Sequence, residues 1–345
     1  MITNFLILIG GLILLVKGSD YFVKSAASIS KRFGVSEFVI GLTLVAFGTS
    51  IPELASSVAA SLNRSSGLII GNVVGSNIAN IGLIIGITSL VAVIKTNKGM
   101  LKRDGYIMVF VALIFLIFSL NGTISRLESG VLLLLYVAYT LFLFEMKPEL
   151  EGKYNFKEFF EYLYKFQYVT TIRKKALSGF SKNKKKEMVG VAKVGLFKDF
   201  VVLIFGGIAI VFGAKYLVGQ AVYFADIFNL PQTLVGISLI AIGTSLPELS
   251  VSISAARKGF ANIAIGNIIG SNIANVLLVA GISGIIFPLE VLRSTVYYII
   301  PFMIFMSVLL LAFLRTRWKI TKIEGAILLL LYVVFMVLLV TQFIS

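Results

Sequence analysis

Hydrophobic runs of roughly 20 residues recur along the chain, and short segments rich in charged or turn residues separate them. A helix of about that length crosses a hydrocarbon core ~30 Å thick. Every backbone polar group must be satisfied inside lipid, so the runs predict membrane-spanning helices. Their boundaries predict ten spans, at about 2–29, 36–60, 67–93, 104–121, 128–146, 196–222, 232–256, 261–287, 294–314 and 320–342.

The predicted spans fall into two groups of five, one on each side of a polar segment of about 50 residues. We therefore expect an all-α polytopic membrane protein with ten transmembrane helices. Its parts are a first five-helix repeat at 1–146, a basic loop at 147–195 and a second five-helix repeat at 196–345.

The two groups repeat each other in sequence. Residues 41–89 align without gaps with residues 236–284, an offset of 195, with 23 identities in 49 positions. The most similar segments are two pairs of motifs, GTSIPEL (48–54) with GTSLPEL (243–249) and GNVVGSNIAN (71–80) with GNIIGSNIAN (266–275). An odd number of spans in each half predicts that the second copy is inverted relative to the first. Inverted repeats are typical of secondary transporters, whose substrate site lies near the midplane between the halves.

Composition supports a membrane protein and narrows its metal chemistry. The chain is 58% hydrophobic and 14% charged, with a mean hydropathy of +0.98, which is too apolar for an ordinary soluble domain. It contains neither Cys nor His, which excludes disulfides, thiolate ligands and imidazole ligands. Any metal ion must therefore bind to oxygen atoms, and Zn²⁺ and Cu⁺ are disfavoured.

The net charge of +15 could indicate a nucleic-acid partner, but the basic residues gather in particular loops. With the N-terminus outside, 24 Lys and Arg residues fall in loops on the inner side and three, Arg64, Arg126 and Arg293, in outer loops. The positive-inside rule then predicts a protein of the cell membrane with both termini extracellular and residues 147–195 cytoplasmic. The expected partner is the lipid bilayer, with no nucleic acid.

The central loop contains a candidate amphipathic helix. Phe156, Phe159, Phe160 and Leu163 are spaced as on one helical face, with lysines nearby, so the helix could lie on the inner membrane surface. The basic run 182–186 is a candidate for contact with anionic lipid. A solvated charge cluster that only fixes the orientation is the alternative.

Glu53 and Glu248 are the candidate charges of the site. Each lies inside an apolar span, where a carboxylate is costly and usually functional, and the two occupy equivalent positions of the repeat. Pro52 and Pro247 precede them and should break the helices, since proline removes a backbone hydrogen bond and crowds the preceding turn. The freed carbonyl oxygens would be additional ligands. A simple packing kink is the alternative.

A second polar helix is expected beside each broken one. Asn72, Ser76 and Asn80 follow one another at intervals of four and share a helical face, as do Asn267, Ser271 and Asn275. The glycines of the same motifs form a small-xxx-small pattern that brings helices close. Carboxylates, hydroxyls, amide oxygens and freed carbonyls together make an all-oxygen site. Such a site suits Ca²⁺, which takes about 6–8 oxygen ligands, and Na⁺, which is similar in size.

The paired GTSxPE and GNxxGSNxxN motifs resemble the two repeats of the Ca²⁺/cation antiporter superfamily, most closely its prokaryotic Na⁺/Ca²⁺ exchangers. The resemblance covers nearly the whole chain. It implies that Glu53 and Glu248 bind both ions and that main-chain oxygens of Thr49 and Thr244 complete the Ca²⁺ position. It also implies further ion-site positions, which are Ala46, Ser50, Ser76, Asn80, Ala241, Ser245, Ser271 and Asn275.

Position 275 departs from the family pattern. Relatives often carry Asp there, as the K⁺-dependent exchangers do, so Asn275 argues against K⁺ co-transport. The resemblance implies an antiporter that exchanges three Na⁺ for one Ca²⁺ by alternating access, with Ca²⁺ and Na⁺ as substrates, no cofactor and no enzymatic activity. An H⁺/Ca²⁺ exchanger that uses the same two glutamates is the alternative, followed by a passive cation channel.

Overall fold

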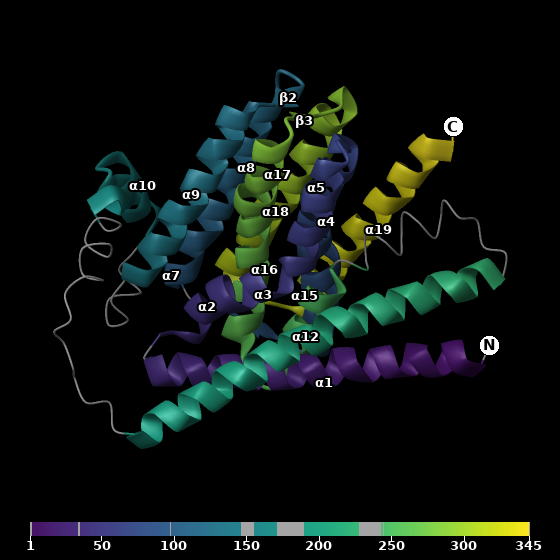
Figure 1. Cartoon of the computed structure of the whole chain (residues 1–345). Helices are drawn as coiled ribbons and strands as arrows, with labels where there is room; N and C mark the ends of the chain where they lie inside the picture. Colours follow the sequence, from purple (N-terminus) through teal and green to yellow (C-terminus); the bar gives the residue numbers. More distant parts are fainter. Residues whose placement is uncertain are drawn as a thin grey trace.

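The computed structural model describes residues 2–33, 35–96, 98–145, 155–170, 190–227, 243 and 245–344. In this part the chain is predominantly helical (Figure 1). The first half begins with the long helix α1 (Ile2–Phe33). The elements that follow are α2 (Glu37–Ile40), η1 (Gly41–Val45), α3 (Ala46–Thr49), α4 (Ile51–Leu62), α5 (Ser66–Ala79), η2 (Asn80–Ile85), α6 (Gly86–Val91), α7 (Lys98–Met100), η3 (Leu101–Gly105), α8 (Tyr106–Ser119) and α9 (Arg126–Glu145), where η marks a π-helical segment.

The second half has a similar order. The short helix α10 (Phe156–Tyr164) precedes it in the chain. Its described elements are α12 (Gly190–Ile227), α15 (Leu246–Arg257), α16 (Ala261–Ala274), η6 (Asn275–Val279), α17 (Ala280–Ile286), η7 (Thr295–Ile299), α18 (Ile300–Arg317) and α19 (Lys322–Ile344). Four two-residue strands join the bundle helices: β1 (Ile94–Lys95), β2 (Thr123–Ile124), β3 (Leu289–Glu290) and β4 (Lys319–Ile320).

Most of the predicted spans correspond to described helices that are long enough to cross a membrane. Among the described residues, seven helices are long and apolar enough to cross a membrane. The pair Glu37–Thr49 and Ile51–Leu62, bent by 45°, makes an eighth. The predicted span 104–121 corresponds to α8, which is only 14 residues long. The predicted span 232–256 lies partly outside the described residues.

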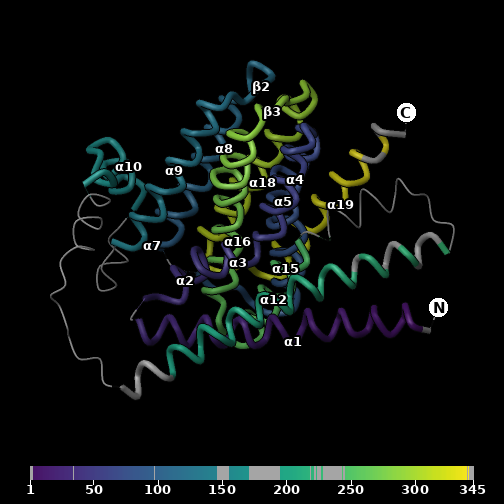
Figure 2. The backbone as a smooth tube through the Cα atoms, viewed as in Figure 1, coloured from purple at the N-terminus to yellow at the C-terminus, as the bar shows by residue number. Residues whose placement is uncertain are grey.

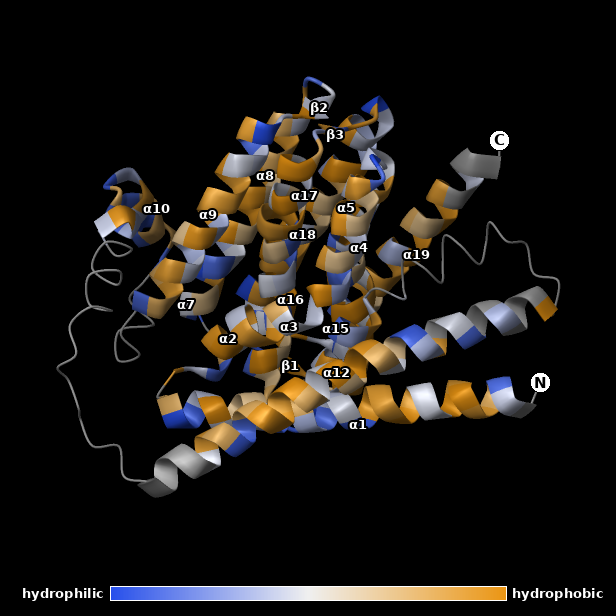
Figure 3. Cartoon of the chain, viewed as in Figure 1, coloured by the Kyte–Doolittle hydropathy of each residue, from blue (hydrophilic) through white to orange (hydrophobic). Residues whose placement is uncertain are grey.

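Two long helices lie side by side across one end of the bundle formed by the others. These are α1 and α12, and the backbone tube shows the same arrangement (Figures 1 and 2). They approach through small residues: a Cβ added at Gly18 would lie 3.0 Å from the carbonyl oxygen of Gly206, and one at Gly213 would lie 2.8 Å from that of Gly11. The pairing of 11 with 213 and of 18 with 206 makes the two helices antiparallel. Both carry apolar residues over much of their length (Figure 3).

The four short strands form two matching ladders. β1 pairs with β4, with Ile94 opposite Ile320, and β2 pairs with β3, with Ile124 opposite Leu289. Each ladder joins one half of the chain to the other. The strands were not predicted, because two apolar residues in a loop carry no periodic pattern of their own.

Helix α10 confirms the predicted helix in the central loop but packs on protein. Phe159 and Tyr162 are buried, and the ring of Phe159 lies 5.9 Å from Tyr139 and 5.4 Å from Phe142 of α9. Only the opposite side, with Phe160 half exposed, remains available to lipid. The basic run 182–186 lies outside the described residues.

Candidate functional site

The first motif-bearing helix breaks shortly before its glutamate, and the described part of the second begins in the same way. In the first half α3 ends at Thr49, and α4 begins at Ile51 with Pro52 in its first turn. The residue between them, Ser50, has φ −84° and ψ 7°. Ser245 has nearly the same angles, φ −90° and ψ 2°, before α15. The break predicted from proline is therefore present in α3–α4, and α15 starts with the same geometry.

Each glutamate lies in the first turn of a described helix. Glu53 lies in the first turn of α4 and Glu248 in the first turn of α15. A carboxylate near a helix N-terminus is stabilised by the helix dipole. Both side chains are buried, at 2% and 1% exposure, yet Oε2 of each has no hydrogen-bond partner among the described residues. A buried carboxylate oxygen without a partner is costly unless a cation binds it.

Four asparagines connect α5 to α16 through reciprocal hydrogen bonds. Asn80 Nδ2 donates to Asn272 Oδ1 at 2.9 Å, and Asn275 Nδ2 donates to Asn77 Oδ1 at 3.1 Å. The two bonds are equivalent, because Asn275 and Asn272 occupy the repeat positions of Asn80 and Asn77. They occupy the amide nitrogens of Asn80 and Asn275 and leave the Oδ1 atom of each buried without a partner. The bonds thus keep the acceptor ends of these amides free.

The unpartnered oxygens form a matched set. Two carboxylate oxygens, from Glu53 and Glu248, and two amide oxygens, from Asn80 and Asn275, are buried without a partner in the described part of the chain. Each atom has its counterpart in the other repeat. Such oxygen donors are the ligands that Ca²⁺ takes in proteins. The residues therefore fit a hard cation.

Hydroxyl groups complete the link between the halves. Ser50 Oγ lies 3.3 Å from Glu248 Oε1, to which it donates, and 3.1 Å from Ser271 Oγ, so it contacts two residues of the second half. Thr49 Oγ1 donates to Asn267 Oδ1 at 3.0 Å. Residues adjacent to the first break thus contact both motif helices of the second half.

Two further asparagines hold each broken helix against its neighbour. Asn72 Nδ2 donates to the main-chain oxygen of Glu53 at 3.0 Å and to Ser57 Oγ at 2.8 Å. Asn267 Nδ2 donates to Ser252 Oγ at 3.2 Å, which is the equivalent bond in the second half. These amides position the glutamate helices, so the predicted face of asparagines divides into positioning residues and open acceptors.

The other predicted positions are distributed as follows. The carbonyl oxygen of Ala46 accepts from the amide of Ser50 at 3.0 Å. Ser76 is buried and donates to Asn72 Oδ1 at 3.4 Å, while Ser245 Oγ is buried without a described partner. Ala241 and Thr244 lie outside the described residues.

Sequence reasoning missed two kinds of feature at the site. Asn77 and Asn272 orient the amides of Asn275 and Asn80. They lie within the repeated motif, but they are not at the four-residue spacing that defines the predicted polar face. The π-helical segments η2 and η6 were also missed, although they begin at the equivalent residues Asn80 and Asn275. Such segments often occur at functional sites. Identity between the repeats at 77 and 272 is the signal that could have found the first pair.

The glycines of the second motif bring helices together in only part of the described structure. A Cβ added at Gly266 would lie 2.6 Å from the carbonyl oxygen of Phe38, and one at Gly270 would lie 2.5 Å from that of Leu42. The predicted close packing is therefore confirmed for the second half. No described atom lies within 4 Å of a Cβ added at Gly71 or Gly75.

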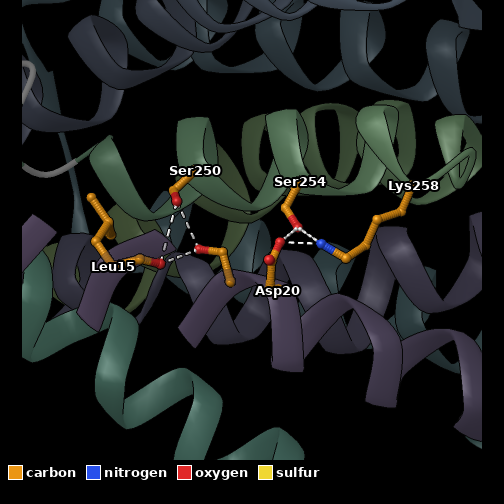
Figure 4. A network of polar contacts seen from close by, with 6 residues as sticks. Leu15, Asp20, Ser250, Ser254 and Lys258 are labelled. Carbon is orange, nitrogen blue, oxygen red and sulfur yellow. Dashed lines mark hydrogen bonds and ion pairs between the residues drawn. The ribbon is translucent and has the colours of Figure 1, made fainter. Parts of the chain in front are cut away.

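A polar network joins α1 to α15, the helix that carries Glu248 (Figure 4). Asp20 accepts a hydrogen bond from Ser254 Oγ at 2.6 Å and forms an ion pair with Lys258. Ser19 Oγ donates to Ser250 Oγ at 2.8 Å. We call these five residues the α1–α15 network.

The repeat does not duplicate this network. The positions equivalent to Asp20 and Lys258 are Lys215 and Asn63, and both of these side chains are exposed. A lysine and an asparagine cannot form the same ion pair. The two halves therefore carry the same residues at the buried oxygens, but they differ at the contact between α1 and α15.

Comparison with known proteins finds similarity to sodium/calcium exchangers. A family model described as sodium/calcium exchanger protein matches residues 3–145 and 198–341. The Sodium/calcium exchanger MaX1 of Methanosarcina acetivorans is 51% identical over 352 residues, covering 98% of this chain and 99% of the relative. The Uncharacterized membrane protein MJ0091 of Methanocaldococcus jannaschii is 33% identical over 330 residues, covering 94% of each. A solved structure of the sodium-calcium exchanger NCX_Mj, soaked with zero Na⁺ and Ca²⁺, matches with a TM-score of 0.76 and 29% identity, covering 98% of this chain and 99% of the other.

Proposed function

Because the chain belongs to the sodium/calcium exchanger protein family, we propose that it is a secondary antiporter that exchanges Ca²⁺ for Na⁺ at the site between Glu53 and Glu248. The observation that carries this function is the matched set of buried, unpartnered oxygens from Glu53, Glu248, Asn80 and Asn275. Two carboxylates balance the charge of one Ca²⁺, and the amides supply neutral ligands. The remaining predicted positions, including Ala241 and Thr244, belong to the same proposal as main-chain or hydroxyl ligands.

The proposed architecture is ten transmembrane helices in two inverted five-helix repeats, at 1–146 and 196–345, with residues 147–195 between them. Three features support it: the antiparallel contact of α1 with α12, the matching strand ladders, and the reciprocal asparagine bonds. In each feature, a contact from the first half to the second has a corresponding contact from the second half to the first. Two parallel copies would not produce antiparallel α1 and α12.

The proposed orientation has both termini outside and the central loop in the cytoplasm. The β1–β4 ladder joins loops that the charge count puts on the cytoplasmic side, and the β2–β3 ladder joins loops that it puts outside. Since the chain has no native cysteine, single cysteines are simple probes. Impermeant maleimide added to intact cells should label a cysteine at 343 and spare one at 170. The reverse pattern would invert the orientation.

The transport reaction is tested most directly in proteoliposomes. ⁴⁵Ca²⁺ uptake should follow an imposed Na⁺ gradient and should be unchanged when K⁺ is omitted, because position 275 carries an amide. Uptake that follows a pH gradient without Na⁺ would favour the H⁺/Ca²⁺ alternative. Ca²⁺ flux without any counter-ion gradient would favour a channel. The proposal includes no cofactor and no enzymatic reaction.

Alternating access requires the two halves to move relative to each other, and the contact of α1 with α15 joins the halves. In the present structure the α1–α15 network holds α1 on the second-half helix. We expect Lys258→Gln to lower the equilibrium constant for the contact between α1 and α15 by about tenfold. A hydrogen bond to a charged group is worth about 1.5–3 kcal/mol, and this pair is partly exposed, so the low end of that range applies.

The weakened contact can be measured as a change in the labelling rate of a cysteine at position 255, which is buried on α15. Lys258→Gln should accelerate labelling from the cytoplasmic side, and Asp20→Asn should do the same. Lys215→Gln is the matched control, because it removes a lysine at the position equivalent to Asp20 on the other long helix. Equal rates in all three variants would contradict a holding role for the ion pair.

A further inference from the structure

Two hollows adjoin at one end of the bundle, away from the ion site. The first is a groove of about 860 Å³ between α8 and α18, and the second is a pocket of about 660 Å³. Four residues line both of them, Leu101, Tyr106, Phe156 and Arg315, so the two form one continuous depression. Phe156 comes from α10, and its ring lies 5.4 Å from that of Phe110 on α8.

The walls of the depression divide sharply by chemistry. The groove is lined mainly by apolar side chains of α8 and α18, such as Leu113 and Val308. The pocket adds Lys98 and Lys102 to the Arg315 that it shares with the groove. None of the described lining residues is acidic, and none of these three cations forms an ion pair with a described residue. The pocket therefore presents three uncompensated positive charges above an apolar slot.

The position of the depression matches a membrane interface. Lys98 follows β1 and Arg315 precedes β4, and these two strands pair with each other at the end of the bundle that carries the basic loops. Trp318, which also lines the pocket, is a residue type that concentrates at the boundary between lipid and water. From this end the groove runs along α8 and α18 into the apolar part of the molecule.

We propose that this depression binds a phospholipid with an anionic head group. The phosphate would interact with Lys98, Lys102 and Arg315, while one acyl chain occupies the groove between α8 and α18. Basic pockets beside transmembrane helices on the cytoplasmic side bind anionic head groups in this way. A neutral lipid would leave three cations unpaired, and a free phosphate would leave the apolar groove exposed. The bound lipid would also contact Phe156 and so connect α10 to the bundle.

The proposal can be tested by retention of lipid on the full-length protein. Native mass spectrometry would compare dioleoylphosphatidylglycerol with dioleoylphosphatidylcholine, each added to delipidated protein. We expect about a hundredfold better retention of the anionic lipid, since each of the three cations contributes about 1 kcal/mol near an anionic lipid surface. The triple variant Lys98→Gln, Lys102→Gln, Arg315→Gln should remove this preference. Lys31→Gln, an exposed lysine at the end of α1, is the control and should keep it.

The groove is tested separately by Ala312→Phe, which fills the slot at an exposed position and so should not disturb folding. It should lower retention of the anionic lipid, whereas Val337→Phe on the exposed face of α19 should not. Equal retention of both lipids by the unmodified protein would overturn the proposal, and so would an unchanged preference in the triple variant. Displacement of the lipid by millimolar inorganic phosphate would also overturn it, because it would identify a simple anion site. None of these outcomes depends on which ions the protein exchanges.

Discussion

Ca²⁺ transport is expected to fall to background when either Glu53 or Glu248 is replaced by glutamine, while the protein remains folded. Both carboxylates are buried and each has an oxygen without a described partner. Two unit charges about 4 Å apart interact by about 4 kcal/mol at an effective dielectric constant near 20, and divalent Ca²⁺ doubles that energy, so the loss of one carboxylate charge should lower affinity by more than about a thousandfold. Glutamine keeps the shape and one oxygen acceptor. The loss therefore reports charge and not packing.

The measurement is Na⁺-driven ⁴⁵Ca²⁺ uptake in proteoliposomes at matched protein levels. Folding is checked by the elution profile and melting temperature of the purified variants. Glu290→Gln is a suitable control, since this glutamate is exposed in β3 and lies outside both motifs. Near-normal flux in Glu53→Gln or in Glu248→Gln would remove the proposed site.

Membrane voltage is expected to drive the exchange. With two glutamates as the site charges, bound Ca²⁺ makes the site neutral, and three Na⁺ make it positive by one. One elementary charge then crosses per cycle and contributes about 2.3 kcal/mol per 100 mV. That energy changes the equilibrium Ca²⁺ ratio by more than about tenfold.

The sign of the voltage effect is also fixed by this stoichiometry. In Na⁺-loaded vesicles, Na⁺ exit carries net positive charge outward, so an interior-positive K⁺ diffusion potential should accelerate Ca²⁺ uptake. Two protons exchanged for one Ca²⁺ would make the loaded site neutral with either substrate and would move no net charge. Uptake that is indifferent to the potential would therefore exclude the three-to-one stoichiometry.

The parts of the fold that sequence predicted well are those set by hydrophobic length and by the repeat. Runs of apolar residues located α1, α9 and α19, because lipid permits little besides a helix there. Proline located the break before Glu53, since the cause is local to the chain. Equivalence within the repeat predicts that Glu53 and Glu248 share one site.

Other features depend on contacts between distant segments and could not be predicted in the same way. The role of Asn77 depends on which amide Asn275 reaches, a question of helix rotation that sequence spacing leaves open. The ion pair of Asp20 with Lys258 was missed because Lys258 was counted only as a cytoplasmic charge. The packing of Phe159 on α9 was missed because an amphipathic helix has the same pattern on a membrane as on protein.

The reciprocal asparagine bonds have a consequence for how such a chain could arise. Each copy of the motif carries both members of the pair, a donor at 80 or 275 and an acceptor at 77 or 272. Two identical antiparallel subunits encoded by an unduplicated gene would form the same two bonds. The ion pair between the long helix and the glutamate helix is different. A dimer of the first half would set Asp20 against Asn63, and a dimer of the second would set Lys215 against Lys258. The two copies can diverge at these positions only when they are encoded separately, so this difference between the two halves arose after the sequence was duplicated.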